Sequence, residues 1–141
     1  MKGNRLNHFA LVSAFASCMA GTAFAEGCAF DGGASVPEIE AFNQMMLDRK
    51  FADFAAALEA TANMNIDGAM QSVSQVYAEG FDGCTTTLQR REVGGLTQHL
   101  VIFHGKAGPL FVYWLYAGTG AEFALLQFNL DSGLDILENL R

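Results

Sequence analysis

The chain has 141 residues, of which 51% are hydrophobic, and it carries fifteen acidic residues against eight basic ones, for a net charge of −7. This length is enough for one domain with a sizeable core, and a second domain is not expected. The acidic balance repels phosphate backbones and anionic lipid surfaces, so no nucleic acid is expected as a partner.

The first 25 residues have the features of a cleavable secretory signal. Lys2 and Arg5 make the amino end positive, and no acidic residue precedes Glu26. Residues 9 to 19 then form an apolar or small stretch, which is too short for a membrane span of about 20 residues. We therefore expect export without a stable membrane span.

The expected cleavage site is the bond between Ala25 and Glu26. Ala23 and Ala25 match the A-x-A pattern that signal peptidases accept. Cleavage there leaves residues 26 to 141 as a single mature domain, which we expect to be periplasmic or secreted. This domain keeps six basic residues against fifteen acidic ones, so its net charge is −9.

Lipidation is the alternative for the same segment. The run Phe15-Ala16-Ser17-Cys18 loosely resembles the bacterial lipoprotein box, in which the cysteine is acylated. That box usually begins with Leu rather than Phe, and the A-x-A site is the cleaner match. Acylation would place the mature amino terminus at Cys18 instead of Glu26.

Removal of the signal leaves two cysteines, Cys28 and Cys84. Because exported proteins fold in an oxidising compartment, we expect these two residues to form a disulfide. Closing a loop of this length stabilises the fold by about 4 kcal/mol in the chain-entropy model. The alternative is a thiol nucleophile paired with His99 or His104, but a reactive thiol is at risk of oxidation outside the cytoplasm.

Helical spacing dominates the first half of the mature chain. We expect a first helix that opens at residues 35 to 38, with Ser35 as its cap and Pro37 in its first turn, and a break at residues 48 to 50 that gives either two helices or one kinked helix. A further helix is expected after Asp67 as its cap, with Gly80 as its stop. The apolar positions are Ile39, Phe42 and Met46, then Phe51, Phe54, Ala55, Leu58 and Ala62, then Met70, Val73, Val76 and Tyr77.

The second half is rich in β-branched and aromatic residues. We expect four strands at about 84 to 93, 96 to 104, 110 to 117 and 121 to 130. The Gly94-Gly95 pair predicts a two-residue hairpin turn, which favours an antiparallel meander. A short closing helix follows, with Leu134, Leu137 and Leu140 facing one way. The expected fold is therefore α+β: helices packed on a curved four-stranded meander, then a short helix.

The third expected strand is apolar on both faces. Leu110, Val112, Trp114 and Tyr116 lie on one face, and Phe111, Tyr113 and Leu115 lie on the other. A solvated face would alternate with polar residues, so we expect both faces to be covered. The helices can cover one of them. Strong curvature of the sheet, the closing helix, or a second copy in a homodimer can cover the other.

Two segments carry a resemblance to known proteins. The run MMLDRKFADFAAAL, residues 45 to 58, resembles the opening of NTF2-like domains, in which a helix ends in a charged turn before a second helix. Residues 111 to 137 resemble small exported bacterial proteins of uncharacterised function. The resemblance implies an NTF2-like or cystatin-like fold. Enzymes on the NTF2-like fold usually place an Asp/His or Asp/Tyr set in the pocket, and no such set is identifiable here.

His99 and His104 are the only histidines of the mature chain, and both lie in the second expected strand. Residues five apart point to opposite faces of a strand and cannot share a metal ion without a bulge. No metal site and no cofactor are therefore expected. His99 is the candidate general base, with Asp53 or Glu122 as its carboxylate partner. The alternative for His99 is a solvated or satisfied half-buried side chain.

Tyr113, Trp114 and Tyr116 are candidates for lining a ligand pocket, because such side chains combine apolar area with a polar tip. Core packing explains the same residues, since strands are enriched in these types.

Two functional hypotheses follow. The first is a non-enzymatic exported module that binds a small apolar ligand or a protein partner through a pocket or a sheet face. The second is a small hydrolase or isomerase of the same fold, in which His99 and a carboxylate act in the pocket and tyrosines position the substrate. A structural role in the cell envelope, without a small ligand, is the third option.

Overall fold

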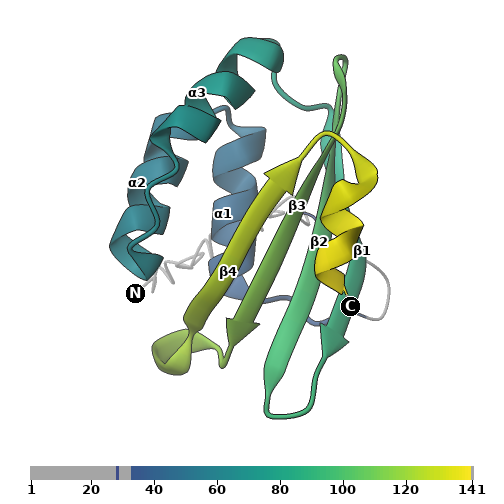
Figure 1. The fold of residues 1–141 in the computed structure, drawn as a ribbon. Coiled ribbons are helices and arrows are strands. Elements are labelled where there is room, and N and C mark those ends of the chain that lie inside the picture. The colour runs from purple at the N-terminus through teal and green to yellow at the C-terminus, as the bar shows by residue number, and fades with distance from the viewer. Residues whose placement is uncertain (1–27, 29–32, 141) are drawn as a thin grey trace, which may run out of the picture.

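The computed structural model describes Cys28 and residues 33 to 140. The predicted signal, its cleavage site and Cys18 lie outside these residues. The elements follow in the order α1 (Pro37–Leu47), α2 (Phe51–Ala62), α3 (Asp67–Val76), β1 (Gly83–Arg91), β2 (Leu96–Gly105), β3 (Gly108–Ala117), the 3-10 turn η1 (Gly120–Glu122), β4 (Ala124–Asp131) and the 3-10 helix η2 (Leu134–Leu140). The predicted α+β class is confirmed, with helices first, a four-stranded antiparallel sheet and a short closing helix (Figure 1).

The charged turn at residues 48 to 50 separates two helices, so the two-helix alternative holds. Arg49 adopts a left-handed conformation with a φ of 61°. The Arg49 N–H donates to the Met46 carbonyl at 3.1 Å, and the Lys50 N–H donates to the Met45 carbonyl at 2.8 Å. These bonds satisfy carbonyls that the end of α1 would otherwise leave free, and they turn the chain into α2.

Both predicted helix caps are wrong by one residue, since Val36 and Ile66 hold the cap positions. α1 begins directly at Pro37 after an extended Val36, and Ser35 makes no capping bond. Proline has no N–H to satisfy and its φ suits the first turn, which explains why the helix starts there. Asp67 is itself the first residue of α3, and the Asn65 side chain accepts its N–H at 3.4 Å.

The sheet is an antiparallel meander in the order β1-β2-β3-β4. Four residues, 92 to 95, connect β1 and β2 rather than the predicted two, and the Glu92 N–H donates to the Leu96 carbonyl at 2.7 Å across this connection. Gly94 and Gly95 have φ values of 89° and 84°, as such a turn requires. β4 begins at Ala124 and not at residue 121, since the turn η1 occupies residues 120 to 122.

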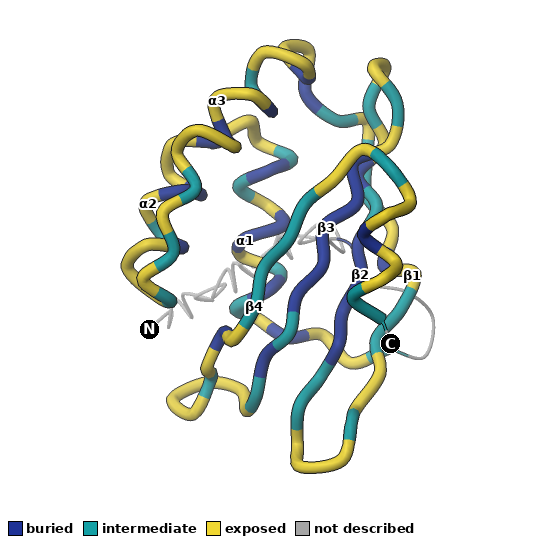
Figure 2. The backbone as a smooth tube through the Cα atoms, in the orientation of Figure 1, coloured by how far each residue is buried: buried dark blue, intermediate teal, exposed yellow. Residues whose placement is uncertain are grey.

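The three helices cover one face of the sheet (Figures 1 and 2). The core between the helices and the sheet contains several aromatic side chains. Trp114 is fully buried at its centre, with ring centroids of Phe42 at 5.3 Å and Phe128 at 4.8 Å. Aromatic pairs of this kind contribute about 0.5–1.5 kcal/mol beyond the area they bury. Val76 departs from its predicted role on the buried face of α3, since it is 59% exposed.

η2 crosses the opposite face of the sheet, so the closing helix covers part of that face (Figure 1). Ile136 is buried there beside Tyr113, and Asn139 accepts hydrogen bonds from Gln127 and Asn129 of β4 at 3.2 and 3.1 Å. A 3-10 helix repeats every three residues, so Ile136 and Asn139 face the sheet together. The predicted row of Leu134, Leu137 and Leu140 therefore points away from the sheet at its start, where Leu134 is 67% exposed.

No helix in the part of the chain that the structure describes is long and apolar enough to cross a membrane.

Candidate functional site

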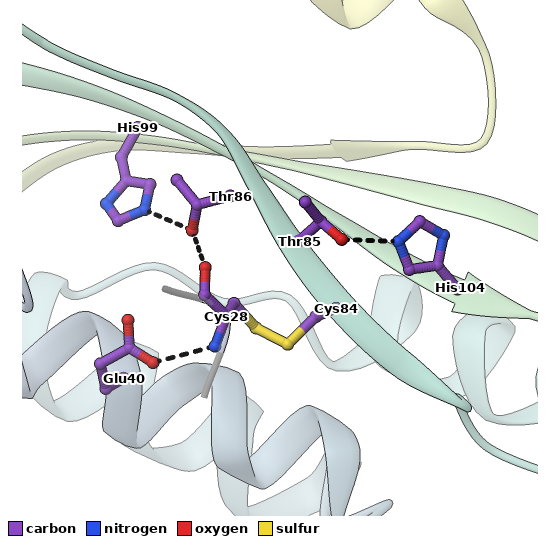
Figure 3. The surroundings of a disulfide bond; sticks show 7 residues. All are labelled: Cys28, Glu40, Cys84, Thr85, Thr86, His99 and His104. Atoms are coloured by element: carbon purple, nitrogen blue, oxygen red, sulfur yellow. Dashed lines mark hydrogen bonds between the residues drawn. A yellow bond between two sulfur atoms is a disulfide. The ribbon is translucent and has the colours of Figure 1, made fainter. Parts of the chain in front are cut away.

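Cys28 and Cys84 form a disulfide, as predicted, with their Cα atoms 5.0 Å apart (Figure 3). The bond links the segment before α1 to the start of β1. Cys28 is fully buried. The thiol-nucleophile alternative is thereby wrong for the oxidised protein, because neither sulfur is free.

The backbone of Cys28 bridges β1 and α1. Its carbonyl accepts the Thr86 N–H at 2.9 Å and also the Thr86 hydroxyl, and its N–H donates to Glu40 Oε2 at 3.2 Å. Burial raises the pKa of Glu40, although the hydrogen bond from the Cys28 N–H acts in the opposite direction. Cys28 thus occupies the free edge of β1 beside Thr86, where it satisfies one backbone donor of that strand.

His99 lies beneath this bridge, on the helix-covered face of the sheet, and is 2% exposed. Its Nε2 lies 3.1 Å from Thr86 Oγ1, and its Nδ1 lies 3.5 Å from the Tyr116 hydroxyl. Because the Thr86 hydroxyl donates to Cys28, its oxygen must accept from Nε2–H, which leaves Nδ1 as the acceptor. Burial lowers the pKa of His99 to about 4, so the imidazole is neutral at pH 7.

His104 lies on the other face of the sheet, as the spacing of the two histidines predicts (Figure 3). It is exposed, and its Nε2 lies 2.9 Å from Thr85 Oγ1. Within the described residues no group of three His, Cys, Asp or Glu side chains is arranged to hold a metal ion.

The structure does not assemble the predicted general-base pair. The hydrogen-bond partners of His99 are the hydroxyls of Thr86 and Tyr116. Asp53 lies exposed on α2, and Glu122 lies exposed in η1. His99 is therefore a satisfied core histidine among the described residues, which is the alternative that its half-buried position in a strand suggested.

The three aromatic pocket candidates lie in the core and are each at most 2% exposed. Trp114 and Tyr116 face the helices, whereas Tyr113 lies on the opposite face in the cluster under η2. A single pocket cannot be lined by all three, because the sheet separates them.

A surface hollow of about 340 Å³ lies between α2 and α3. Phe51, Ala55 and Met70 are buried residues that form its apolar floor, while Arg49 and Asp67 stand exposed among its lining residues. Sequence reasoning assigned these positions to the helix core and to the charged turn. The one signal that could have found the site is an arginine in the turn between two helices.

A smaller hollow of about 190 Å³ lies between α1, α2 and the residue after η1. Phe42, Met45, Ala57 and Phe123 line it, together with Glu38. Glu38 Oε1 accepts the Gly120 N–H at 2.6 Å and so attaches the β3–β4 connection to the start of α1. Its size limits it to a small group.

Arg49 is held against Gly80 at the edge of the larger hollow. A Cβ atom on Gly80 would lie 2.7 Å from Arg49 Cδ, so the aliphatic stem of the arginine packs where Gly80 has no side chain. The ion pairs of the described residues join Lys50 to Asp48, Arg90 to Glu92 and Lys106 to Glu79. The Arg49 guanidinium is thus free of a carboxylate partner within the described part of the chain.

Comparison with family models, with curated proteins and with solved structures found no match for this chain.

Proposed function

We propose that the chain is an exported, non-enzymatic binding protein that takes a small apolar ligand in the hollow between α2 and α3. The signal features of residues 1 to 25 support export, and the Cys28–Cys84 disulfide suits an oxidising compartment. The NTF2-like or cystatin-like resemblance stays a prediction.

The observation that carries this proposal is the composition and size of the hollow. Ligand pockets are commonly about 300 Å³ or larger, with apolar walls and a few polar groups, and this hollow has a volume of about 340 Å³. Phe51 and Met70 are 8% and 2% exposed, so the floor of the hollow is part of the packed helix core.

The arrangement of His99 favours binding over the hydrolase or isomerase hypothesis. A general base must reach the proton that it abstracts. His99 is instead buried beneath Cys28, with two hydroxyl partners. Its low pKa reflects the cost of charging a buried imidazole, which a structural histidine also shows.

The binding test uses the mature protein with 13C-labelled methionine methyl groups and octan-1-ol as a neutral apolar probe. Met70 reports the α2–α3 hollow and Met45 reports the smaller one. We expect octan-1-ol to shift the Met70 methyl signal in a saturable manner.

A matched pair of variants places the ligand in the hollow. Ala52 lines it and is exposed, so Ala52→Leu fills the space; Ala60 is also exposed on α2 but lies outside the lining, so Ala60→Leu is the control. Ala52→Leu should abolish the Met70 shift, and Ala60→Leu should preserve it. An absent shift, or equal binding by both variants, would contradict the proposal.

Export has its own test, because it does not depend on the hollow. The intact mass of the protein recovered outside the cytoplasm should correspond to a chain that begins at Glu26. A mass that corresponds to an acylated amino-terminal Cys18 would instead support the lipoprotein alternative.

A further inference from the structure

We propose that the ligand of the α2–α3 hollow is an apolar monocarboxylate, with its carboxylate bound by Arg49 and its hydrocarbon chain on the floor of Phe51, Ala55 and Met70. This inference rests on the function proposed above and names the chemical class of the ligand.

Arg49 has an unusual backbone conformation for an arginine. Arg49 occupies the left-handed position just after α1, where glycine is the usual residue because it carries no Cβ. A long charged side chain is uncommon at such a position. Glycine would form this turn with less strain, so we attribute the arginine at this position to a role of its side chain.

The aliphatic stem of Arg49 packs against Gly80. Gly80 is buried, and a Cβ atom there would lie 2.7 Å from Arg49 Cδ and 2.9 Å from Cγ. The stem therefore rests on the backbone of Gly80, which reduces the rotamer freedom that the arginine would lose on binding a ligand. The guanidinium belongs to the lining of the hollow.

Charge complementarity selects a carboxylate. The planar fork of a guanidinium matches the two oxygens of a carboxylate and binds them with paired hydrogen bonds. Arg49 forms no ion pair with the residues that the structure describes, so its donors are available for a ligand. Arginine also keeps its charge at all physiological pH values.

Asp67 weakens the binding of any anion in the hollow and disfavours a second negative charge most. It lines the same hollow and is exposed at the start of α3. Its carboxylate repels a second anionic group, and so does the net charge of −7 on the whole chain. The apolar floor then selects a hydrocarbon tail over a polar one.

The test compares octanoate with octan-1-ol, which have eight-carbon chains and differ in the head group. The mature protein with labelled methionine methyl groups is titrated with each probe, and the Met70 signal is followed. A charge-assisted hydrogen bond contributes about 1.5–3 kcal/mol, so octanoate should bind about tenfold or more tightly than octan-1-ol.

Two arginine variants and one aspartate variant test the assignment. Arg49→Gln keeps most of the stem and removes the charge, so it should lose the roughly tenfold preference for octanoate while octan-1-ol binds as before. Arg91→Gln is the control, because Arg91 is exposed on β1 and forms no ion pair with the described residues either. Asp67→Asn should strengthen octanoate binding and leave octan-1-ol binding unchanged.

The outcomes separate this inference from the proposed function. Equal affinity of the unmodified protein for both probes, or an unchanged preference in Arg49→Gln, would overturn the carboxylate assignment while leaving apolar binding intact. Absence of a Met70 shift with either probe would remove both proposals. If Arg49→Gln fails to fold, the Asp67→Asn result decides, and no gain in octanoate binding would count against the assignment.

Discussion

Removing the disulfide should cost most of the stability of this domain. The variant is Cys28→Ala combined with Cys84→Ala, because alanine leaves no new polar group in the buried position of Cys28. The bond joins residues separated by 56 positions. Releasing a loop of that length gives the unfolded chain about 4 kcal/mol of extra conformational freedom in the chain-entropy model.

The backbone contacts of Cys28 add to this figure. Its N–H donates to Glu40 at 3.2 Å and its carbonyl accepts the Thr86 N–H at 2.9 Å. Each such bond contributes about 1 kcal/mol when the segment is held in place. The expected loss is therefore about 4–6 kcal/mol, which is close to the whole stability of many domains of about 5–15 kcal/mol.

Urea unfolding followed by fluorescence measures this loss. Trp114 is the single tryptophan and is fully buried, so its emission reports the core. Glu40→Ala with the disulfide intact is the control, and it should cost only the share of that one hydrogen bond, about 1 kcal/mol. A loss below about 1 kcal/mol in the double variant would refute the loop-closure reasoning.

Two further predictions concern pH and the glycines. The pKa of His99 is about 4 in the folded protein against 6.5 for a free histidine. The unfolded chain therefore binds a proton more readily, so the contribution of His99 to stability is fully present above pH 6.5 and is lost as the pH falls from 6.5 to about 4. The loss amounts to about 3 kcal/mol. Urea unfolding at several pH values should show this fall in the free energy of unfolding for His104→Gln and not for His99→Gln. An equal fall in both variants would contradict the prediction. Gly80→Ala should destabilise the fold by more than about 1 kcal/mol, because its φ is 83° and its Cβ would meet Arg49. Gly68→Ala should stabilise α3 by about 0.5–1 kcal/mol, because a Cβ atom at Gly68 would have no other atom within 4 Å. Thermal unfolding should therefore give a higher Tm for Gly68→Ala than for Gly80→Ala, and the reverse order would contradict both predictions.

Sequence reasoning succeeded where the determining contacts are local or where chemistry allows one partner. The apolar alternation of the third strand predicted which side chains share a face, and the register of β3 confirms it. The cysteine pair was predictable because the expected removal of residues 1 to 25 would leave two cysteines, Cys28 and Cys84. The positive φ values of Gly94 and Gly95 follow from the turn itself.

The reasoning failed where two local choices have similar energy. Ser35 is a good cap in isolation, yet Pro37 starts the helix without one. Residues 121 to 123 have strand-like composition in part, but Gly120 has a φ of 61° and its N–H binds Glu38, which is distant in the sequence. Such a contact cannot be read from the neighbouring residues.

The fate of His99 shows most clearly what the sequence leaves open. The sequence predicted a strand residue on the face opposite His104, with either a catalytic or a satisfied role. The choice between these roles depended on Cys28. The disulfide to Cys84 holds Cys28 beside β1, where Thr86 bonds both to the Cys28 carbonyl and to His99. Burial and hydrogen bonding are properties of the assembled layers, so the tertiary structure alone determined that this imidazole is neutral.

The sequence by itself determined the α+β class, the antiparallel meander, the disulfide pair and the two apolar faces of β3. These features follow from periodicity, turn chemistry and cysteine count, which act over short distances along the chain or have a single solution. The tertiary structure decided which loops and helices meet: that Arg49 rests on Gly80 beside a hollow, and that Ile136 closes the far face of the sheet. Those contacts depend on how helices and sheet pack in three dimensions, and no local pattern encodes them.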